Sequence, residues 1–245
     1  MRTFHLSPEL WHEPYALEGQ EARHLVKVLR VRAGEQIRLL DGQGREGFFR
    51  ITDTEKHRVH LEPESIITHP APASRSVLAV GWGKAVRRGW LLEKAVELEA
   101  AGVWLWQAER SQSRVPEEAK ESWLAQMVAG AKQSSNPWLP ELRTLPGGIQ
   151  ELATAAADFD RCYLLWEGET PEAVLGPQHV GLPGSTLYIV GPEGGFSDRE
   201  VTALRDGGCQ PVSLGQRVLR WETAALLCLG LHWWARQQNT DGERS

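Results

Sequence analysis

Two glycine-bearing segments near the C-terminus hold the residue types best suited to chemistry. Residues 191–197 read GPEGGFS and follow the apolar run 186–190, while residues 214–224 read LGQRVLRWETA and begin at the end of a short predicted strand over 211–214. Glycine lets the backbone approach a ligand closely, because no Cβ intervenes. In open α/β sheets, ligands bind outside the carboxyl ends of the strands. The two segments therefore predict a small-molecule site with charged groups beside it.

The first segment does not match a common nucleotide-binding loop. The first lacks the G-x-G-x-x-G spacing, and no Gly-Lys-Ser/Thr follows it. Glu193 would repel a phosphate but suits a cationic ligand. A tight turn before a helix is the alternative reading of this segment. For the second, the alternative is a helix start at Glu222 or Thr223, with Arg217 and Arg220 in solvent.

The N-terminal part of the chain has the pattern of a small β-domain. Residues 1–70 alternate short apolar stretches with turn signals, and Asp41-Gly42 between two such stretches indicates a hairpin. We expect a small β-barrel with one helix near residues 20–31. A Pro-, Ala- and Ser-rich stretch over residues 71–76 is the expected linker.

From residue 77 to 238, predicted strands and helices alternate, which indicates an α/β domain with a parallel sheet. Ser197 and Glu200 form an S-x-x-E capping box that should open a helix. The polar residues 239–245 are expected to be a flexible tail. The remaining predictions are strands at 77–80, 103–106, 162–166, 186–190 and 211–214, and helices at 88–101, 117–133 and 222–237.

Composition restricts the class of protein. Of the 245 residues, 41% are hydrophobic and 24% charged, and no apolar run reaches the ~20 residues that a membrane span requires. Cys162, Cys209 and Cys228 form neither a disulfide framework nor a zinc pattern. The first residues lack the apolar core of a signal peptide, so we expect a reducing cytoplasm. The histidines have no metal-ligand spacing, and no metal is expected.

A basic helix face near the N-terminus suggests an RNA contact. Arg23, Lys27 and Arg30 lie at i, i+4 and i+7, with Leu25 and Val28 expected on the other side. The net charge of −5 argues mildly against a nucleic-acid partner, but clustered cations matter more than the sum. An ordinary solvated basic face is the alternative.

The two C-terminal segments, in this order and spacing, resemble the SPOUT superfamily of methyltransferases. More narrowly, they resemble the ribosomal small-subunit methyltransferase E family, which methylates N3 of a uridine in small-subunit (16S) ribosomal RNA. Residues 24–30, 93–98, 109–111 and 131–134 also match, so the resemblance covers almost the whole chain. The sequence departs from the family pattern at Trp221, at Glu99 and at residues 135–137.

The resemblance implies an N-terminal PUA-like β-barrel and a C-terminal trefoil-knotted SPOUT domain that acts as a homodimer. It also implies the cofactor S-adenosyl-L-methionine, bound by three loops over residues 165–168, 191–196 and 214–219. The cofactor-binding residues carried over are Leu165, Trp166, Glu167, Gly168, Val190, Gly191, Pro192, Glu193, Gly194, Gly195, Leu214, Gly215, Val218, Leu219, Thr223 and Ala224. The RNA-binding residues expected in the barrel are Arg2, Arg23, His24, Lys27 and Arg30.

The implied reaction removes a proton from uridine N3, which is a poor nucleophile while protonated. Arg220 is the candidate that stabilises the developing charge on the uracil oxygens. Glu193 or Glu222 could accept the proton or orient Arg220, and the sequence leaves this choice open. Naked ribosomal RNA or an assembled small subunit would be the substrate. Methylation of ribose 2′-OH or guanine, and an RNA-binding or assembly factor without catalysis, are the alternatives.

Overall fold

The computed structural model describes residues 1–83, 87–168 and 173–242, and it divides into two compact units. The first unit consists of Met1–Ala71 and Val128–Leu139, and the second of Pro72–Met127 and Pro140–Ser245. The N-terminal unit is therefore built from two separate stretches of chain. The boundary falls inside helix α3 (Glu121–Ser134).

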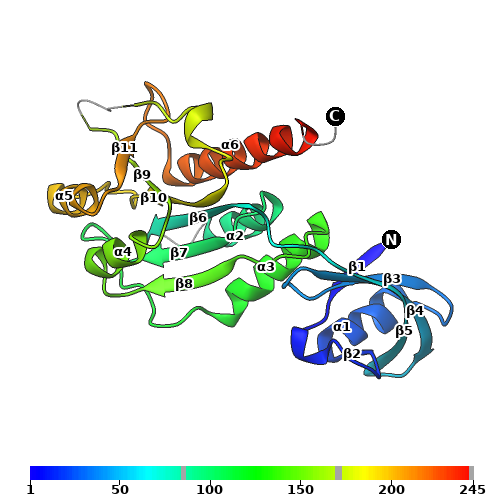
Figure 1. Cartoon of the computed structure of the whole chain (residues 1–245). Helices are drawn as coiled ribbons and strands as arrows, with labels where there is room; N and C mark the ends of the chain where they lie inside the picture. Colours follow the sequence, from blue (N-terminus) through cyan, green and yellow to red (C-terminus); the bar gives the residue numbers. More distant parts are fainter. Residues whose placement is uncertain (84–86, 169–172, 243–245) are drawn as a thin grey trace. The chain divides into compact units, whose positions relative to one another are not determined.

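The first unit is a five-stranded sheet that curls around a short helix, α1 (Gly19–Arg23) (Figure 1). The sheet order is β1-β3-β4-β5-β2, with β1 parallel to β3 and the other pairs antiparallel. A 3-10 turn, Pro8–Leu10, follows the first strand. The strands are β1 (Arg2–His5), β2 (Ala16–Glu18), β3 (Gln36–Leu40), β4 (Arg45–Thr54) and β5 (Arg58–Thr68).

The helix expected near residues 20–31 is present, but its second half is a π-helix, His24–Leu29. Leu25 is fully buried in the core of the unit, together with Ile37, Phe49 and Val59. Val28, which was expected on the side away from the basic face, is 66% exposed. A π-helix has a wider turn than an α-helix, which shifts the directions of its side chains.

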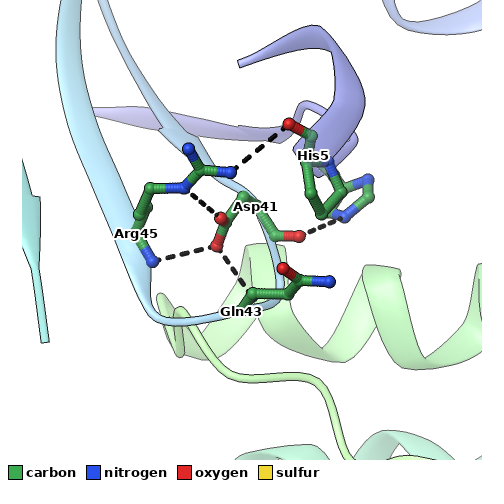
Figure 2. Close-up of polar contacts among 5 residues, drawn as sticks. His5, Asp41, Gln43 and Arg45 are labelled. Carbon is green, nitrogen blue, oxygen red and sulfur yellow. Dashed lines mark hydrogen bonds and ion pairs between the residues drawn. The ribbon is translucent and has the colours of Figure 1, made fainter. Parts of the chain in front are cut away.

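The predicted hairpin at Asp41-Gly42 is confirmed between β3 and β4, and Figure 2 shows the contacts that hold it. The buried carboxylate of Asp41 accepts hydrogen bonds from the backbone N–H of Gln43 at 2.7 Å and of Arg45 at 2.9 Å. Nε of Arg45 donates to the same carboxylate at 2.6 Å. The ring of His5 bonds to the Asp41 carbonyl at 3.3 Å. A charged, fully satisfied carboxylate thus fixes the turn.

The segment after α3 belongs to the first unit because it bonds to this turn. The N–H of Gly44 donates to the carbonyl of Pro137, and the N–H of Leu139 donates to the carbonyl of Gly42, both at 2.9 Å. Gly44 has a φ of +93°, and a Cβ there would overlap the Trp138 ring. This glycine therefore allows both the turn and the close packing of Trp138.

The second unit is a six-stranded, wholly parallel sheet in the order β11-β9-β10-β6-β7-β8 (Figure 1). Its strands are β6 (Ser74–Gly81), β7 (Gly102–Trp106), β8 (Glu141–Leu145), β9 (Arg161–Leu165), β10 (Gly184–Val190) and β11 (Gln210–Val212). Besides α3, its helices are α2 (Arg88–Glu97), α4 (Ile149–Ala156), α5 (Asp198–Asp206) and α6 (Trp221–Gly242), with a 3-10 turn at Pro177–His179.

Alternate residues of the strands bury opposite faces of this sheet. Ala79, Leu164 and Ile189 share a core with residues of α4 and α5. On the other face, α6 packs against β6, β10 and α2. There the buried ring of His232 is hydrogen-bonded to Ser74 at 2.9 Å and to Tyr188 at 3.0 Å, which joins α6 to both central strands.

The predicted alternation of strands and helices is confirmed, with corrections at several places. Residues 74–76, expected in the linker, form the start of β6. Residues 239–242, expected in the tail, continue α6, and the rest of that tail lies outside the described residues. Elements β8 and α4 were not predicted.

The expectation that the cysteines form no disulfide was wrong, because Cys162 and Cys209 are joined. Cys162 lies on β9 and Cys209 directly precedes β11, and these two strands are neighbours in the sheet. The pairing of Gln210 with Tyr163 brings the preceding residues side by side, with 4.6 Å between their Cα atoms. Cys228 is a free, buried thiol.

Candidate functional site

The three loops expected to bind the cofactor follow three adjacent strands. Strands β9, β10 and β11 are parallel and occupy the positions β11-β9-β10, so their carboxyl ends lie at one edge of the sheet. The N–H of Trp166 after β9 donates to the carbonyl of Val212 at 3.1 Å. The N–H of Leu175 donates to Ser213 at 2.9 Å. These bonds join the chain after β9 to the end of β11, directly before the third loop.

The loops enclose a pocket of about 950 Å³ at this edge of the sheet. All but two of the predicted cofactor-binding residues line it, the exceptions being Gly194 and Thr223. Thr223 is exposed on the first turn of α6. The lining residues among those predicted are Leu165, Trp166, Glu167, Gly168, Val190, Gly191, Pro192, Glu193, Gly195, Leu214, Gly215, Val218, Leu219 and Ala224.

The loop after β10 makes a tight turn against the neighbouring strand. The N–H of Gly195 donates to the carbonyl of Pro192 at 2.8 Å, and Gly195 has a φ of +71°, which favours glycine. A Cβ on Gly81 of β6 would come within 2.5 Å of the nitrogen of Pro192. Phe196 stacks on Trp106 with 5.9 Å between ring centroids. The loop is therefore held from both sides.

The predicted capping box is confirmed and does more than start α5. Ser197 accepts a hydrogen bond from the N–H of Glu200 at 3.2 Å, and the carboxylate of Glu200 accepts one from the N–H of Ser197 at 2.8 Å. The other oxygen of this fully buried carboxylate accepts from the N–H of Glu109 at 2.8 Å. The next residue, Arg110, lines the pocket and donates to the carbonyl of Gly194 at 3.0 Å.

The charged candidates lie in the same pocket but in different environments. Arg220 and Glu193 are exposed, whereas Glu222 is only 4% exposed and forms an ion pair with Arg87. Burial lowers the pKa of the neighbouring Arg88, and the negative charge of Glu193 raises it. Arg88 donates to the carbonyl of Gly83 at 2.7 Å and lies 3.6 Å from the centroid of the Trp82 ring.

Several pocket residues were not predicted as site residues. Arg110 belongs to the family match over 109–111, which was the available signal for it. Arg87 carried no such signal in the sequence. Trp221, the departure in the second loop, is half-buried and lines the pocket at the start of α6. The other lining residues outside the predicted set are Phe196, Val212, Ser213, Gln216 and Arg217.

The residues expected to contact RNA all lie in the first unit, and all are exposed: Arg2, Arg23, His24, Lys27 and Arg30. Nε of Arg23 donates to His57 at 3.3 Å. Across residues 1–83, 87–168 and 173–242, no helix is long and apolar enough to cross a membrane. The same part of the chain contains no cluster of three or more His, Cys, Asp or Glu side chains placed to hold a metal ion.

Comparison with known proteins agrees with this arrangement. Residues 69–233 match the RNA methyltransferase domain family, and residues 17–64 match the RNA methyltransferase PUA domain, which defines the class as RNA methyltransferases. Ribosomal RNA small subunit methyltransferase E of Mycobacterium bovis is 31% identical over 87% of this chain and 84% of its own length. The protein of the same name from Bacillus subtilis is 29% identical over 88% of both chains.

A solved structure extends the agreement to the whole fold. The Ribosomal RNA small subunit methyltransferase E of Neisseria gonorrhoeae, bound to S-adenosyl methionine, has a TM-score of 0.78 and 28% identity. It covers 94% of this chain and 96% of that one. The chain belongs to the ribosomal RNA small subunit methyltransferase E family.

Proposed function

We propose that the protein transfers the methyl group of S-adenosyl-L-methionine to N3 of a uridine in small-subunit (16S) ribosomal RNA. The observation that carries the proposal is the pocket in which the loops after β9, β10 and β11 converge. A pocket of about 950 Å³ suits a cofactor of this size. The relative from Neisseria gonorrhoeae, solved with S-adenosyl methionine, supports the choice of cofactor.

The residues of the pocket fit this cofactor chemically. Leu165, Leu214 and Leu219 offer apolar surface for the adenine, and the glycines of the second loop expose backbone groups to it. Glu193 supplies negative charge for a cationic sulfonium, whereas a phosphate would be repelled. The bound cofactor supplies an electrophilic methyl group, and the chain must position the uracil and remove its N3 proton.

For the reacting base, we assign Arg220 to the charge that develops on the uracil oxygens. The guanidinium of Arg220 offers N–H donors and no acceptor, so it does not serve as the base. Glu193 is the better candidate for proton acceptor, because it is exposed in the pocket, whereas Glu222 is buried and ion-paired. The methyl–sulfur bond breaks as the new bond to N3 forms, and the N3 proton passes to the carboxylate or to solvent.

The remaining features of the resemblance belong to the same proposal. They are the trefoil knot, the homodimer, a cytoplasmic location, and RNA binding by Arg2, Arg23, His24, Lys27 and Arg30 of the first unit. The apolar residues Leu227 and Trp234 on α6 are 38% and 59% exposed, which suits a contact between two copies. The substrate is either naked ribosomal RNA or an assembled small subunit.

The test combines cofactor binding with identification of the product. Titration should show that the protein binds S-adenosylmethionine, and mass spectrometry of digested RNA should show 3-methyluridine after incubation with small ribosomal subunits. Arg220→Ala should lower kcat by about 10²–10³-fold with little change in cofactor affinity. Arg114→Ala is the matched control, an exposed arginine that does not line the pocket. Ribose-methylated or guanine-methylated product, or no cofactor binding, would refute the proposal.

A further inference from the structure

The pocket contains an ion pair between Arg87 and Glu222, and the function proposed above gives Arg87 no part in the reaction. Glu222, in the first turn of α6, has a side chain that is only 5% exposed, and it pairs with Arg87. Arg87 lies at the N-cap of α2, and its side chain is 49% exposed. Both residues line the same pocket as Arg220. A buried carboxylate thus holds a half-exposed guanidinium at the pocket wall.

This arrangement favours orientation over proton transfer. Burying an unpaired carboxylate is costly, and the pair with Arg87 compensates for that cost only while Glu222 stays ionised. Accepting a proton from the substrate would break the pair. A guanidinium has five N–H donors in a fixed plane, and Nη1 of Arg87 bonds to Oε1 of Glu222. The anchored side chain can therefore donate to a second partner without losing its position.

The chemistry of uracil calls for two such donors. N3 lies between two carbonyl groups, and loss of its proton spreads negative charge onto both O2 and O4. One arginine can stabilise one of these oxygens, and a second cation on the other side of N3 would stabilise the remaining one. Glu222 follows Arg220 by two residues, and through Glu222 the chain brings Arg87 and Arg220 to one pocket.

We propose that Arg87 is a second catalytic residue that binds one uracil carbonyl while Arg220 binds the other, and that Glu222 is the positioning residue that holds Arg87. The inference rests on the proposed uridine-N3 methylation. If Glu222 positions Arg87, it is no longer a candidate for proton acceptor. Of the two carboxylates considered for that role, Glu193 then remains.

The first experiment compares Arg87→Ala, Glu222→Gln and the double variant by single-turnover methylation of small ribosomal subunits. Arg87→Ala should lower the methyl-transfer rate about 10²-fold and leave the Kd for S-adenosylmethionine within about twofold. The double variant should be no slower than Arg87→Ala, because Glu222 acts only through Arg87. Arg87→Ala alone leaves the buried carboxylate of Glu222 unpaired, which can impair folding. The double variant removes this carboxylate as well, so the test remains valid if Arg87→Ala folds poorly. Arg114→Ala should match the wild-type rate.

The second experiment is the pH dependence of the rate. If Glu222 positions Arg87, Glu222→Gln should lower the methyl-transfer rate at every pH. A plot of the rate against pH should keep the rising limb that reports deprotonation of the proton acceptor. Loss of that limb would assign the proton acceptor to Glu222 and overturn the inference, as would a wild-type rate in Arg87→Ala or additive effects in the double variant. Failure of the wild-type protein to form 3-methyluridine would instead refute the proposed function, which separates the two claims.

Discussion

The buried histidine between α6 and the central strands should make stability depend on pH in a defined interval. His232 is 1% exposed, and its pKa is lowered from 6.5 to about 4, first by burial and then by the charges of Arg236 and Arg161. Its ring is hydrogen-bonded to Ser74 and Tyr188, so the neutral form is the one the fold accommodates. We predict that acid weakens the fold through this residue.

The sign and the size of the effect follow from proton linkage. Between pH 6.5 and 4 the unfolded chain binds a proton at His232 and the folded chain does not, so stability falls as the pH falls. Above pH 6.5 the ring is neutral in both states and the contribution to stability is constant. At 1.36 kcal/mol per pKa unit, lowering the pKa from 6.5 to about 4 corresponds to about 3 kcal/mol, in order of magnitude.

The assay is urea unfolding of the wild type and of His232→Gln at a series of pH values from 7.5 to 4. Glutamine can retain hydrogen bonds to its neighbours but does not titrate. The variant should be less stable at pH 7.5, and the difference between the two proteins should shrink by about 3 kcal/mol on going to pH 4. Other groups titrate equally in both proteins and cancel in the difference. A constant difference across this range would refute the reasoning.

Three further predictions concern the disulfide, the hairpin turn and the basic helix. Cys162→Ser should destabilise the oxidised protein by about 4 kcal/mol, because the disulfide that it removes spans 47 residues. A reductant should have no further effect on the denaturant unfolding of this variant. Equal stability of the variant and the oxidised wild type would contradict the prediction. Gly44→Ala should lower stability by about 2 kcal/mol more than Gly34→Ala. Both glycines have a positive φ, but only at Gly44 would the added Cβ overlap a side chain, that of Trp138. Similar losses of stability in the two variants would show that the overlap relaxes. Lys27→Ala should reduce the salt dependence of RNA binding by about one phosphate contact, whereas Lys56→Ala on the β4–β5 connection should not; an unchanged slope in Lys27→Ala would place this helix away from the RNA.

Much of the second unit was predictable because its strongest signals are local. The strand at 186–190 is a continuous apolar run, and the capping box at Ser197 marks the helix that follows. Strand β8 was missed because it lies at the edge of the sheet and is mostly half-buried, so its sequence ELRTL lacks that apolar run. Helix α4 was missed because its small residues ATAA are compatible with several structures.

The site residues could be predicted only in the loops whose own sequence contains the glycines and charged residues. The glycines of residues 191–195 and the charged residues of 214–224 stand together in the sequence. Arg87 and Arg110 come from the chain after β6 and after β7, and only the order of the parallel strands brings them to the pocket. The disulfide between Cys162 and Cys209 was not predicted for the same reason, because the spacing of residues in the sequence does not show which strands are neighbours in the sheet.

The divided N-terminal unit has a consequence for how the protein is made. A ribosome synthesises Met1–Ala71 first, but the residues that bond to the β3–β4 turn, within Val128–Leu139, emerge only later. At about 5–20 residues per second, the delay is several seconds. During that interval the nascent strands lack Trp138 over their hairpin, and two of the six strands of the parallel sheet, β6 and β7, are synthesised. The first unit is therefore complete only after part of the second has been synthesised.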